Sequence, residues 1–200
     1  MSLYSIKHSK LAYRIDFALY AALVLIMVAI LLLTGTYERW LAYVAFAAAG
    51  VVSWTLIEYA LHRFVMHGFR PFKQWHTEHH QRPKALIYTP TIMSMALIAT
   101  LVFLPAQTFL RDWQSAYALT LGVVIGYLFY SVVHHLMHHN DDNNIWLKRR
   151  KQWHAMHHQN IEKVAYFGVT SGFWDHVFRS DYRLRKSTRT ARREIDPKSR

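Results

Sequence analysis

The sequence predicts an all-α integral membrane protein with four transmembrane helices and a cytoplasmic helical cap that holds a dimetal site. Three observations lead to this prediction: four long uncharged stretches, basic residues confined to one set of loops, and histidines gathered in four short clusters. The 200 residues amount to one domain. Of these residues 52% are hydrophobic, although 24 Lys and Arg stand against 12 Asp and Glu, so apolar and basic residues must be segregated.

Each uncharged stretch is close to the ~20 residues that a helix needs to cross a bilayer. We expect spans at about residues 15–37, 40–62, 85–106 and 113–135. The first stretch is apolar all round, unlike a helix on the surface of a soluble protein. It is also longer than the ~7–15 apolar residues of a signal peptide and has no cleavage pattern after it, so we expect an anchor.

The segments between the spans follow from turn signals. A turn at residues 34–39 joins the first two spans, and the second helix should continue until Gly68 and Pro71 stop it. Residues 69–84 then form a cytoplasmic segment. Pro105 and the polar residues after it predict the turn between the third and fourth spans.

The fourth span should end at the Asn/Asp-rich run of residues 140–144, and the aromatic, basic sequence after it should fold as part of the cap. We therefore expect one membrane domain over residues 1–182, with the cap built from residues 63–84 and 140–182. The basic end, residues 183–200, is expected to be disordered.

The basic residues predict the orientation. All of them except Arg39 and Arg111 lie before the first span, between the second and third, or after the fourth. The positive-inside rule then places both termini, the middle loop and every histidine cluster in the cytoplasm. Anionic lipid headgroups account for this basic excess, so we expect no nucleic-acid partner. The chain contains no cysteine, which excludes thiolate ligands and iron–sulfur clusters.

Ten of the 14 histidines occur at spacings typical of metal ligands. They are His62 and His67 in HRFVMH, His76, His79 and His80 in HTEHH, His134 and His138 in HHLMH, and His154, His157 and His158 in HAMHH. Neutral imidazole binds zinc, copper, nickel and iron. Two copies of the HxxHH triad indicate two halves of one site and two metal ions.

Helix geometry groups these rings. Residues i, i+3 and i+4 share one helix face, so each triad presents three imidazoles to one side, as do His134 and His138. His62 and His67 differ by about 140° on a regular helix. Either the helix end distorts between them, or they bind different metals.

Other polar residues near the clusters are expected to support the ligands through hydrogen bonds. His135 and His139 lie one position off the ligand face, so they either support the ligands or face the lipid headgroups. Glu58 lies one turn before His62, with a salt bridge to Arg63 as the competing interpretation. Asp175 is a weaker candidate of the same kind. His8 and His176 have no clustered partner and are not expected to bind metal.

The segments EYALHRFVMHG, WHTEHHQRP, YSVVHHLMHH, WHAMHH and FGVTSGFWDHVF resemble the fatty acid hydroxylase/sterol desaturase superfamily of membrane-bound di-iron enzymes. The HRFVMH element and the FG…WDxxF ending are most similar to fatty acid (2-)hydroxylases. Tyr130-Ser131 replaces the Tyr-Asp often found there, and His176 occupies a variable position. The carotene hydroxylases share MHG followed by WHxxHH.

The resemblance implies two iron ions held by the ten histidines, although zinc can occupy such a site in purified material. It implies O2-dependent attack on a C–H bond of a lipid, with a fatty acyl chain as the leading substrate. It also implies an external electron donor, a ferredoxin or a cytochrome b5-like protein with its reductase. A carotenoid or sterol-like substrate, hydroxylated or desaturated, is the alternative. A zinc-dependent membrane lipid hydrolase would leave most of the ten histidines unexplained.

Overall fold

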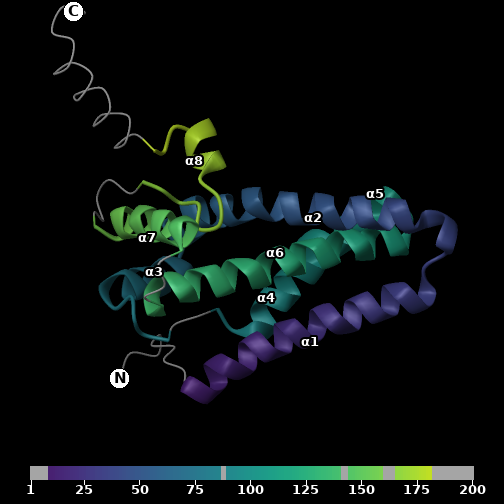
Figure 1. Ribbon diagram of the computed structural model, residues 1–200, viewed down its shortest axis with the longest axis horizontal. Coiled ribbons are helices and arrows are strands. Elements are labelled where there is room, and N and C mark those ends of the chain that lie inside the picture. The colour runs from purple at the N-terminus through teal and green to yellow at the C-terminus, as the bar shows by residue number, and fades with distance from the viewer. Residues whose placement is uncertain (1–8, 87–88, 141–143, 160–164, 182–200) are drawn as a thin grey trace, which may run out of the picture.

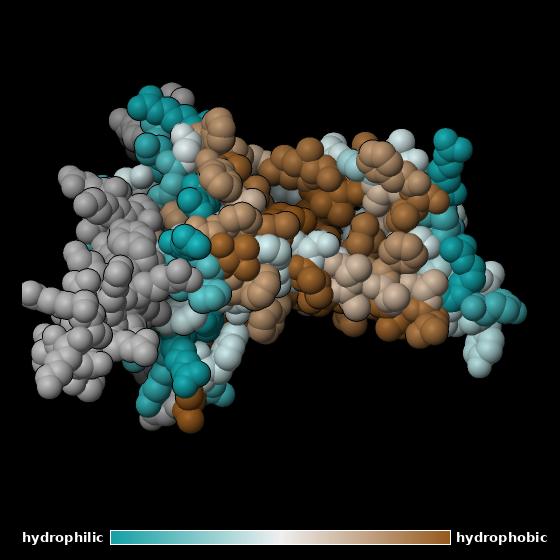
Figure 2. All heavy atoms as spheres, turned by 90° about the horizontal axis from the view of Figure 1, so that it is seen from above, coloured by the Kyte–Doolittle hydropathy of each residue, from teal (hydrophilic) through white to brown (hydrophobic). Residues whose placement is uncertain are grey.

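The computed structural model describes residues 9–86, 89–140, 144–159 and 165–181, and the regular elements of these residues are all helices. Four of the helices are long and apolar enough to cross a membrane: Lys10–Thr34, Tyr37–Met66, Thr91–Leu110 and Trp113–His139. They run side by side along the long axis of the molecule (Figure 1). On the face shown in Figure 2, apolar side chains cover the middle of the bundle and hydrophilic side chains gather at both ends. The predicted four-span fold class is confirmed.

The first two spans form the expected hairpin. Helix α1 (Lys10–Thr34) begins earlier than predicted because the side chain of Ser9 accepts a hydrogen bond from the backbone N–H of Ala12. A short 3₁₀ turn, η1 (Tyr37–Arg39), leads into α2 (Trp40–Ala60). The helix then continues as a π-helical segment, η2 (Leu61–Met66), so the second span extends past its apolar part as predicted.

The third span differs most from its predicted boundaries. It begins at Thr91 because Pro90 disfavours helical geometry in the residue before it. It comprises α4 (Thr91–Ile98), the π-helical η3 (Ala99–Phe103) and α5 (Leu104–Leu110). Pro105 does not make the predicted turn. It follows η3, where the regular hydrogen bonding is already interrupted, so its missing N–H is tolerated.

Helix α6 (Trp113–His139) is the central element of the bundle and packs closely against α2. Gly50 and Gly122 face each other at the crossing, and a Cβ on either would clash with the backbone of the other helix. The core beside this contact is made by Tyr20, Tyr43 and Leu121. At the end of the bundle away from α3, Arg39 pairs with Asp112 at 2.7 Å.

Helices α3 (Phe72–Gln81), α7 (Ile145–His158) and α8 (Phe173–Val177) lie together at the other end of the bundle, and we call them the cap (Figure 1). Asn144 caps α7 by accepting hydrogen bonds from the N–H groups of Trp146 and Leu147. The predicted disordered end, residues 183–200, lies outside the described residues.

Candidate metal centre

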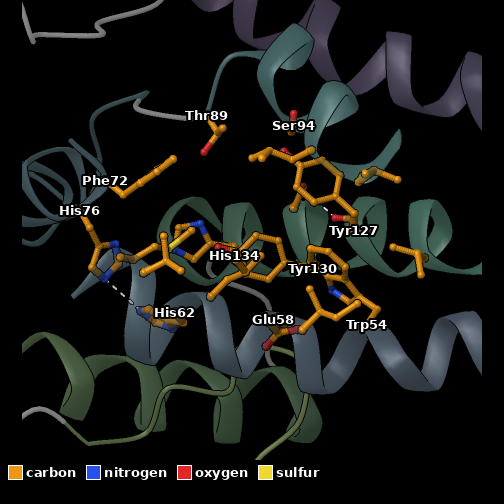
Figure 3. Close-up of a pocket in the computed structure, with 18 of the residues that line it drawn as sticks. Trp54, Glu58, His62, Phe72, His76, Thr89, Ser94, Tyr127, Tyr130 and His134 are labelled. Atoms are coloured by element: carbon orange, nitrogen blue, oxygen red, sulfur yellow. Dashed lines mark hydrogen bonds between the residues drawn. The ribbon is translucent and has the colours of Figure 1, made fainter. Parts of the chain in front are cut away.

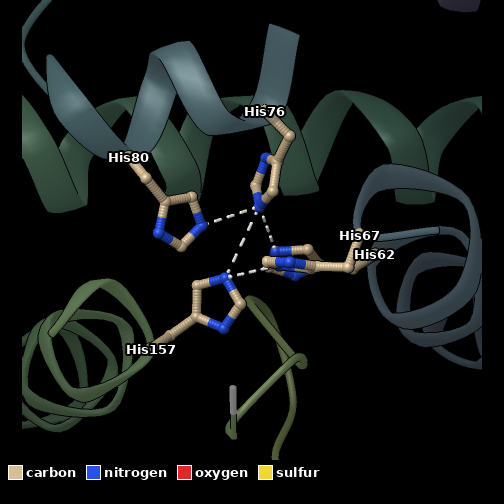
Figure 4. A group of neighbouring side chains, drawn as sticks. All are labelled: His62, His67, His76, His80 and His157. Atoms are coloured by element: carbon tan, nitrogen blue, oxygen red, sulfur yellow. Dashed lines mark hydrogen bonds between the residues drawn. The ribbon is translucent and has the colours of Figure 1, made fainter. Parts of the chain in front are cut away.

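Nine of the ten expected histidines form two groups at the cap end of the bundle. In each group one ring nitrogen of every residue lies within 4.8 Å of those of the others. The five-histidine cluster contains His62, His67, His76, His80 and His157, from η2, its end, α3 and α7 (Figure 4). The four-histidine cluster contains His79, His134, His138 and His154, from α3, α6 and α7.

Each HxxHH triad is divided between the two clusters. In α3, His76 and His80 belong to the five-histidine cluster and His79 to the four-histidine cluster. In α7, His157 and His154 are divided in the same way. The tenth histidine, His158, lies between the clusters: its Nε2 is 3.0 Å from that of His154, and its ring stacks on His80 at 4.2 Å.

The π-helical turn explains how His62 and His67 reach the same cluster. In a π-helix the backbone hydrogen bonds join residues five positions apart, so residues i and i+5 lie much closer to one face than on a regular α-helix. Segment η2 contains His62 and ends just before His67, and the two ring centroids are 5.4 Å apart. Of the two arrangements left open by the sequence, the structure has the distorted helix end.

The nitrogen spacing fits metal ions better than it fits hydrogen bonds alone. The Nε2 atom of His76 lies 3.0 Å from that of His62 and 2.9 Å from that of His80. Nitrogens bound to one metal at about 2.1 Å are roughly 2.9–3.4 Å apart in tetrahedral or octahedral geometry. A single proton on one ring can satisfy only one such contact. In addition, both ring nitrogens of His79 are buried with no hydrogen-bond partner among the described residues.

Burial keeps these imidazoles in the neutral form that binds metal. It lowers the pKa of His79 to about 2 and that of His80 to about 3, and neighbouring imidazoles add to the effect. The pKa values of His67 and His158 fall to about 4 for the same main reason. Those of His76, His154 and His157 also lie well below the usual 6.5.

Residues 165–171, which we call the anchoring segment, are hydrogen-bonded to two rings of the five-histidine cluster. Nδ1 of His62 donates to the carbonyl oxygen of Phe167 at 2.5 Å, and Nδ1 of His157 donates to that of Ala165 at 2.9 Å. Such hydrogen bonds fix the tautomer and the ring orientation, and leave Nε2 to face a metal. Two backbone carbonyls thus orient the rings of His62 and His157, which come from different helices.

Two buried carboxylates hold the anchoring segment in turn. Glu58 accepts hydrogen bonds from the N–H groups of Val169 and Thr170, at 2.5 and 2.9 Å, and one from the hydroxyl of Thr170 at 2.6 Å. Thus Glu58 is linked to His62 through the anchoring segment, to which both side chains are hydrogen-bonded. It does not pair with Arg63, which donates instead to the hydroxyl of Tyr59.

Asp175 binds the same segment from α8. Its carboxylate is fully buried and accepts hydrogen bonds from the N–H groups of Phe167 and Gly168, both at 2.8 Å, and from the hydroxyl of Ser180 at 2.7 Å. Burial raises the pKa of this carboxyl, and the three hydrogen bonds oppose that rise. Asp175 and Glu58 therefore act on the clusters through the backbone of one shared segment.

Three of the other four histidines are described by the structure, and neither cluster includes them. His135 faces α1, where its Nδ1 is 3.1 Å from the hydroxyl of Tyr13, and His139 is exposed and stacks on His135. None of the hydrogen bonds described for these two rings reaches a clustered histidine, so their support of the ligands stays a prediction. His176 is exposed and lies 3.3 Å from Asp181. His8 lies outside the described residues.

A cavity of about 360 Å³ adjoins the clusters and extends into the bundle (Figure 3). Its wall includes His62, His76, His79 and His134 at the cluster end. Sequence reasoning missed this cavity because its walls come from α1, α2, α3, α4 and α6, and no local pattern shows how distant helices meet. One residue in the sequence did point to a polar site inside the bundle: Asp16, which lines the cavity, is an acidic residue at the start of the first apolar stretch.

Comparison with known proteins places this arrangement in context. The profile of the family described as fatty acid hydroxylase matches residues 46–180. The dihydroceramide fatty acyl 2-hydroxylase FAH2 of Arabidopsis thaliana is 33% identical over 142 residues, which cover 66% of this chain and 58% of the plant protein. The human fatty acid 2-hydroxylase is 28% identical over 64% of this chain and 37% of its own length.

A solved structure shares the fold. The structure of full-length scs7p, in which only the hydroxylase domain is visible, aligns with a TM-score of 0.68 and 26% sequence identity. The alignment covers 84% of this chain and 66% of that one. The chain spans less than two thirds of the length of the curated relatives that it matches.

Proposed function

The chain belongs to the fatty acid hydroxylase family, and from this membership we propose that it is an O2-dependent di-iron hydroxylase that acts on a fatty acyl chain of a lipid. The observation that carries the proposal is the junction of two histidine clusters with an apolar cavity inside a membrane-spanning bundle. A lipid tail can enter such a cavity without leaving an apolar environment. The family match favours a fatty acyl chain over a carotenoid or a sterol-like lipid.

The two clusters would hold one iron ion each, with His158 available between them. Bound iron would supply the activation of O2 and the redox chemistry that breaks an unactivated C–H bond. The nine converging imidazoles fit this role better than that of a hydrolytic zinc site, which uses about three protein ligands and an open position. The anchoring segment keeps the rings of His62 and His157 oriented.

The cavity positions the acyl chain and excludes water from it. Four histidines lie at one end of the wall, and the opposite part is lined by apolar side chains such as Leu101, Val102 and Val123. A chain lying along this wall would present carbons near its polar end to the clusters. Holding the reacting carbon beside the metals converts the attack into an intramolecular step.

Electrons must reach the cap, and we propose a separate acidic carrier as their source. Hydroxylation with O2 consumes two electrons per turnover. Among the basic residues of α7, Lys148 and Arg149 are exposed, whereas Arg150 is buried with its guanidinium 4.0 Å from the ring of Trp153. Lys151 donates to the carbonyl of Asn140. Only the first two are therefore available to attract a carrier to a cap that faces the cytoplasm.

The proposal is tested by lipid mass spectrometry of cells that express the protein under isotopically labelled O2. A hydroxylated acyl chain that carries the label is expected with the intact protein and not with His157→Ala. The matched control is His176→Ala, since His176 is exposed and lies outside both clusters. Iron should be measured in the same membranes. Product without the label, or equal product from His157→Ala, would rule the proposal out.

A further inference from the structure

The short helix α8 of the cap carries an exposed apolar patch. Phe173 and Val177 are 60% and 47% exposed, and Phe178, directly after the helix, is 49% exposed. A contiguous exposed patch of this kind marks a surface that contacts a membrane or another molecule. None of the three residues belongs to a histidine cluster or lines the cavity, so the patch has no part in the site described above.

Helix α8 packs against α2 within the second candidate span (Figure 1). The indole N–H of Trp174 donates to the hydroxyl of Thr55 at 2.9 Å. The rings of Phe178 and Tyr59 are stacked, with their centroids 5.3 Å apart. Thr55 and Tyr59 share one face of α2 and lie closer to the middle of the bundle than His62 does. Helix α8 therefore lies beside the membrane-crossing part of α2 and not beyond its end.

The surface of α2 next to this contact is also apolar and exposed. Val51, Val52 and Leu56 are 38%, 65% and 40% exposed. Val51 and Val52 precede Thr55 by four and three residues, and so lie on the face of α2 that α8 contacts. In a helix long and apolar enough to cross a membrane, exposed valine and leucine side chains face lipid. The patch on α8 thus continues a lipid-facing surface of the bundle.

The two sides of α8 differ in character. Phe173 and Val177 are four residues apart and share one side, and Asp175 points about 160° away from each of them. The Asp175 carboxylate is fully buried and holds the anchoring segment, whereas the apolar side is open. Arg179, just after the patch, is exposed. An apolar side with a basic residue beside it is typical of helices that lie in the membrane interface.

We propose that α8 is seated in the bilayer, with lipid acyl chains of the leaflet on the cap side covering Phe173, Val177 and Phe178. Lipid is the occupant because the same acyl chains already cover the neighbouring surface of α2. A protein partner would first have to displace them. The bilayer then presses α8 against α2 and keeps Asp175 in contact with the anchoring segment. The inference depends on the membrane-spanning bundle and not on the reaction that the protein catalyses.

The test measures the depth of α8 in a bilayer. The chain contains no cysteine, so Phe173→Cys and Val177→Cys each provide a single site for an environment-sensitive fluorophore. The labelled full chain is reconstituted into phosphatidylcholine vesicles that contain a nitroxide near the carboxyl end of the acyl chain. Iodide serves as the quencher in water. An interfacial helix buries its apolar side about 5–10 Å deep, so we expect quenching by the nitroxide lipid and little quenching by iodide.

Two further single-cysteine variants calibrate the measurement. Val52→Cys lies on the exposed apolar face of the second span and gives the response of a lipid-facing label. Gln152→Cys lies at an exposed polar position of α7 and gives the response of a water-facing label. Nitroxide quenching at both α8 positions should exceed that at Gln152→Cys by at least about threefold. The elution volume before reconstitution shows whether each variant is folded.

Two results would overturn the proposal. Iodide quenching at both α8 positions as strong as that at Gln152→Cys would place the patch in water. Labels that neither quencher reaches would show that protein covers the patch, either a second copy of the chain or another segment of it. The proposed function is judged separately: labelled hydroxylated product from a protein whose α8 lies in water removes only the seat in the bilayer, and a seated α8 without any such product removes only the reaction.

Discussion

The buried carboxylates Glu58 and Asp175 orient the five-histidine cluster indirectly, through the backbone of the anchoring segment. Neither contacts a histidine in the interactions described above. Both bind N–H groups of the anchoring segment, whose carbonyls at Ala165 and Phe167 accept from His157 and His62. Replacing either carboxylate would therefore let the backbone of the anchoring segment move, and the rings of His62 and His157 would move with it. The effect should be on metal retention before it is on folding.

We predict that Glu58→Gln and Asp175→Asn each weaken metal binding by about 10–100-fold, the usual loss when a group that orients a ligand is removed. Each amide keeps the shape of the side chain but offers only one oxygen as acceptor. The measurement is the rate and extent of metal loss to a chelator in detergent. Glu38→Gln, at an exposed position, is the matched control. Retention equal to that of the control would show that the anchoring segment does not orient the rings.

The low pKa values of the cap histidines give a second prediction, on stability against pH. In the unfolded chain these imidazoles take up protons below about 6.5, whereas His76, His79 and His80 resist protonation in the folded cap. The unfolded state therefore binds more protons as the pH falls. The midpoint of thermal unfolding of chelator-treated protein should be highest above pH 6.5 and fall steadily below it, toward the folded-state pKa values of about 3 for His80 and about 2 for His79.

The control for this pH dependence is His176→Gln. His176 is exposed beside Asp181, outside the buried clusters, so its replacement should leave the slope unchanged. Replacing a buried ring, as in His79→Gln, should reduce the slope. A midpoint that stays flat between pH 6.5 and 4 would mean that the rings are not shielded from protons in the folded protein.

At the scale of the element, the π-helical η2 joins the second span to the five-histidine cluster. The residues before it follow an α-helix across the bundle, and the turn then brings His62 and His67 to one side. The distortion is local, and no span depends on it for length. The element can therefore be altered while the bundle stays intact.

Deleting Phe64, which is 56% exposed, should convert η2 into regular α-helix with one residue fewer before His67. His62 and His67 would then be four residues apart on a regular helix, so both rings would stay on one face and His67 would keep its place in the five-histidine cluster. We predict that the deletion variant keeps its metal as a membrane-inserted, monodisperse protein, measured by metal analysis and size-exclusion chromatography. Phe64→Ala keeps the register and should also keep the metal. Loss of metal from a folded deletion variant would contradict this account of η2.

The elements differ in how far the sequence could predict them. The spans follow from apolar length, and the two triads follow from spacing, because both signals are local. The anchoring segment could not be predicted, since its contacts to Glu58 and His62 cross more than one hundred residues of sequence. The state of η2 was left open, because spacing shows that His62 and His67 need a distortion but not that one occurs. The turn predicted at Pro105 was wrong. Proline interrupts a regular α-helix, but here it follows the π-helical η3, where the hydrogen bonding is already interrupted, and the helix continues.

At the scale of the whole molecule, the close contact of α2 with α6 sets the distance between the elements that carry His62 and those that carry His134. Gly50 and Gly122 permit this approach, and there is no room at either position for a Cβ without movement of the backbone. In membranes such small residues allow helices to pack by van der Waals contact where no hydrophobic driving force acts between them.

We predict that Gly122→Leu separates the two helices and lowers the midpoint of thermal unfolding markedly, together with loss of metal from both clusters. The side chain would meet the backbone carbonyl of Ala47 directly. Val44→Leu adds bulk on the same span at a position that is 61% exposed, on the lipid side, and should be tolerated. Unfolding is followed by tryptophan fluorescence in detergent. An unchanged midpoint in Gly122→Leu would show that the crossing can widen at little cost.

The division of each HxxHH triad between the two clusters has a consequence for assembly. Helix α3 lends His76 and His80 to one cluster and His79 to the other, and α7 divides His157 and His154 likewise. If each cluster holds a metal ion, the ion captured by one cluster would immobilise two helices that the second ion also needs, so the second would pay less entropy to be bound. Loading would then be cooperative: partly filled molecules would be scarce, and the protein would pass between empty and full in nearly one step.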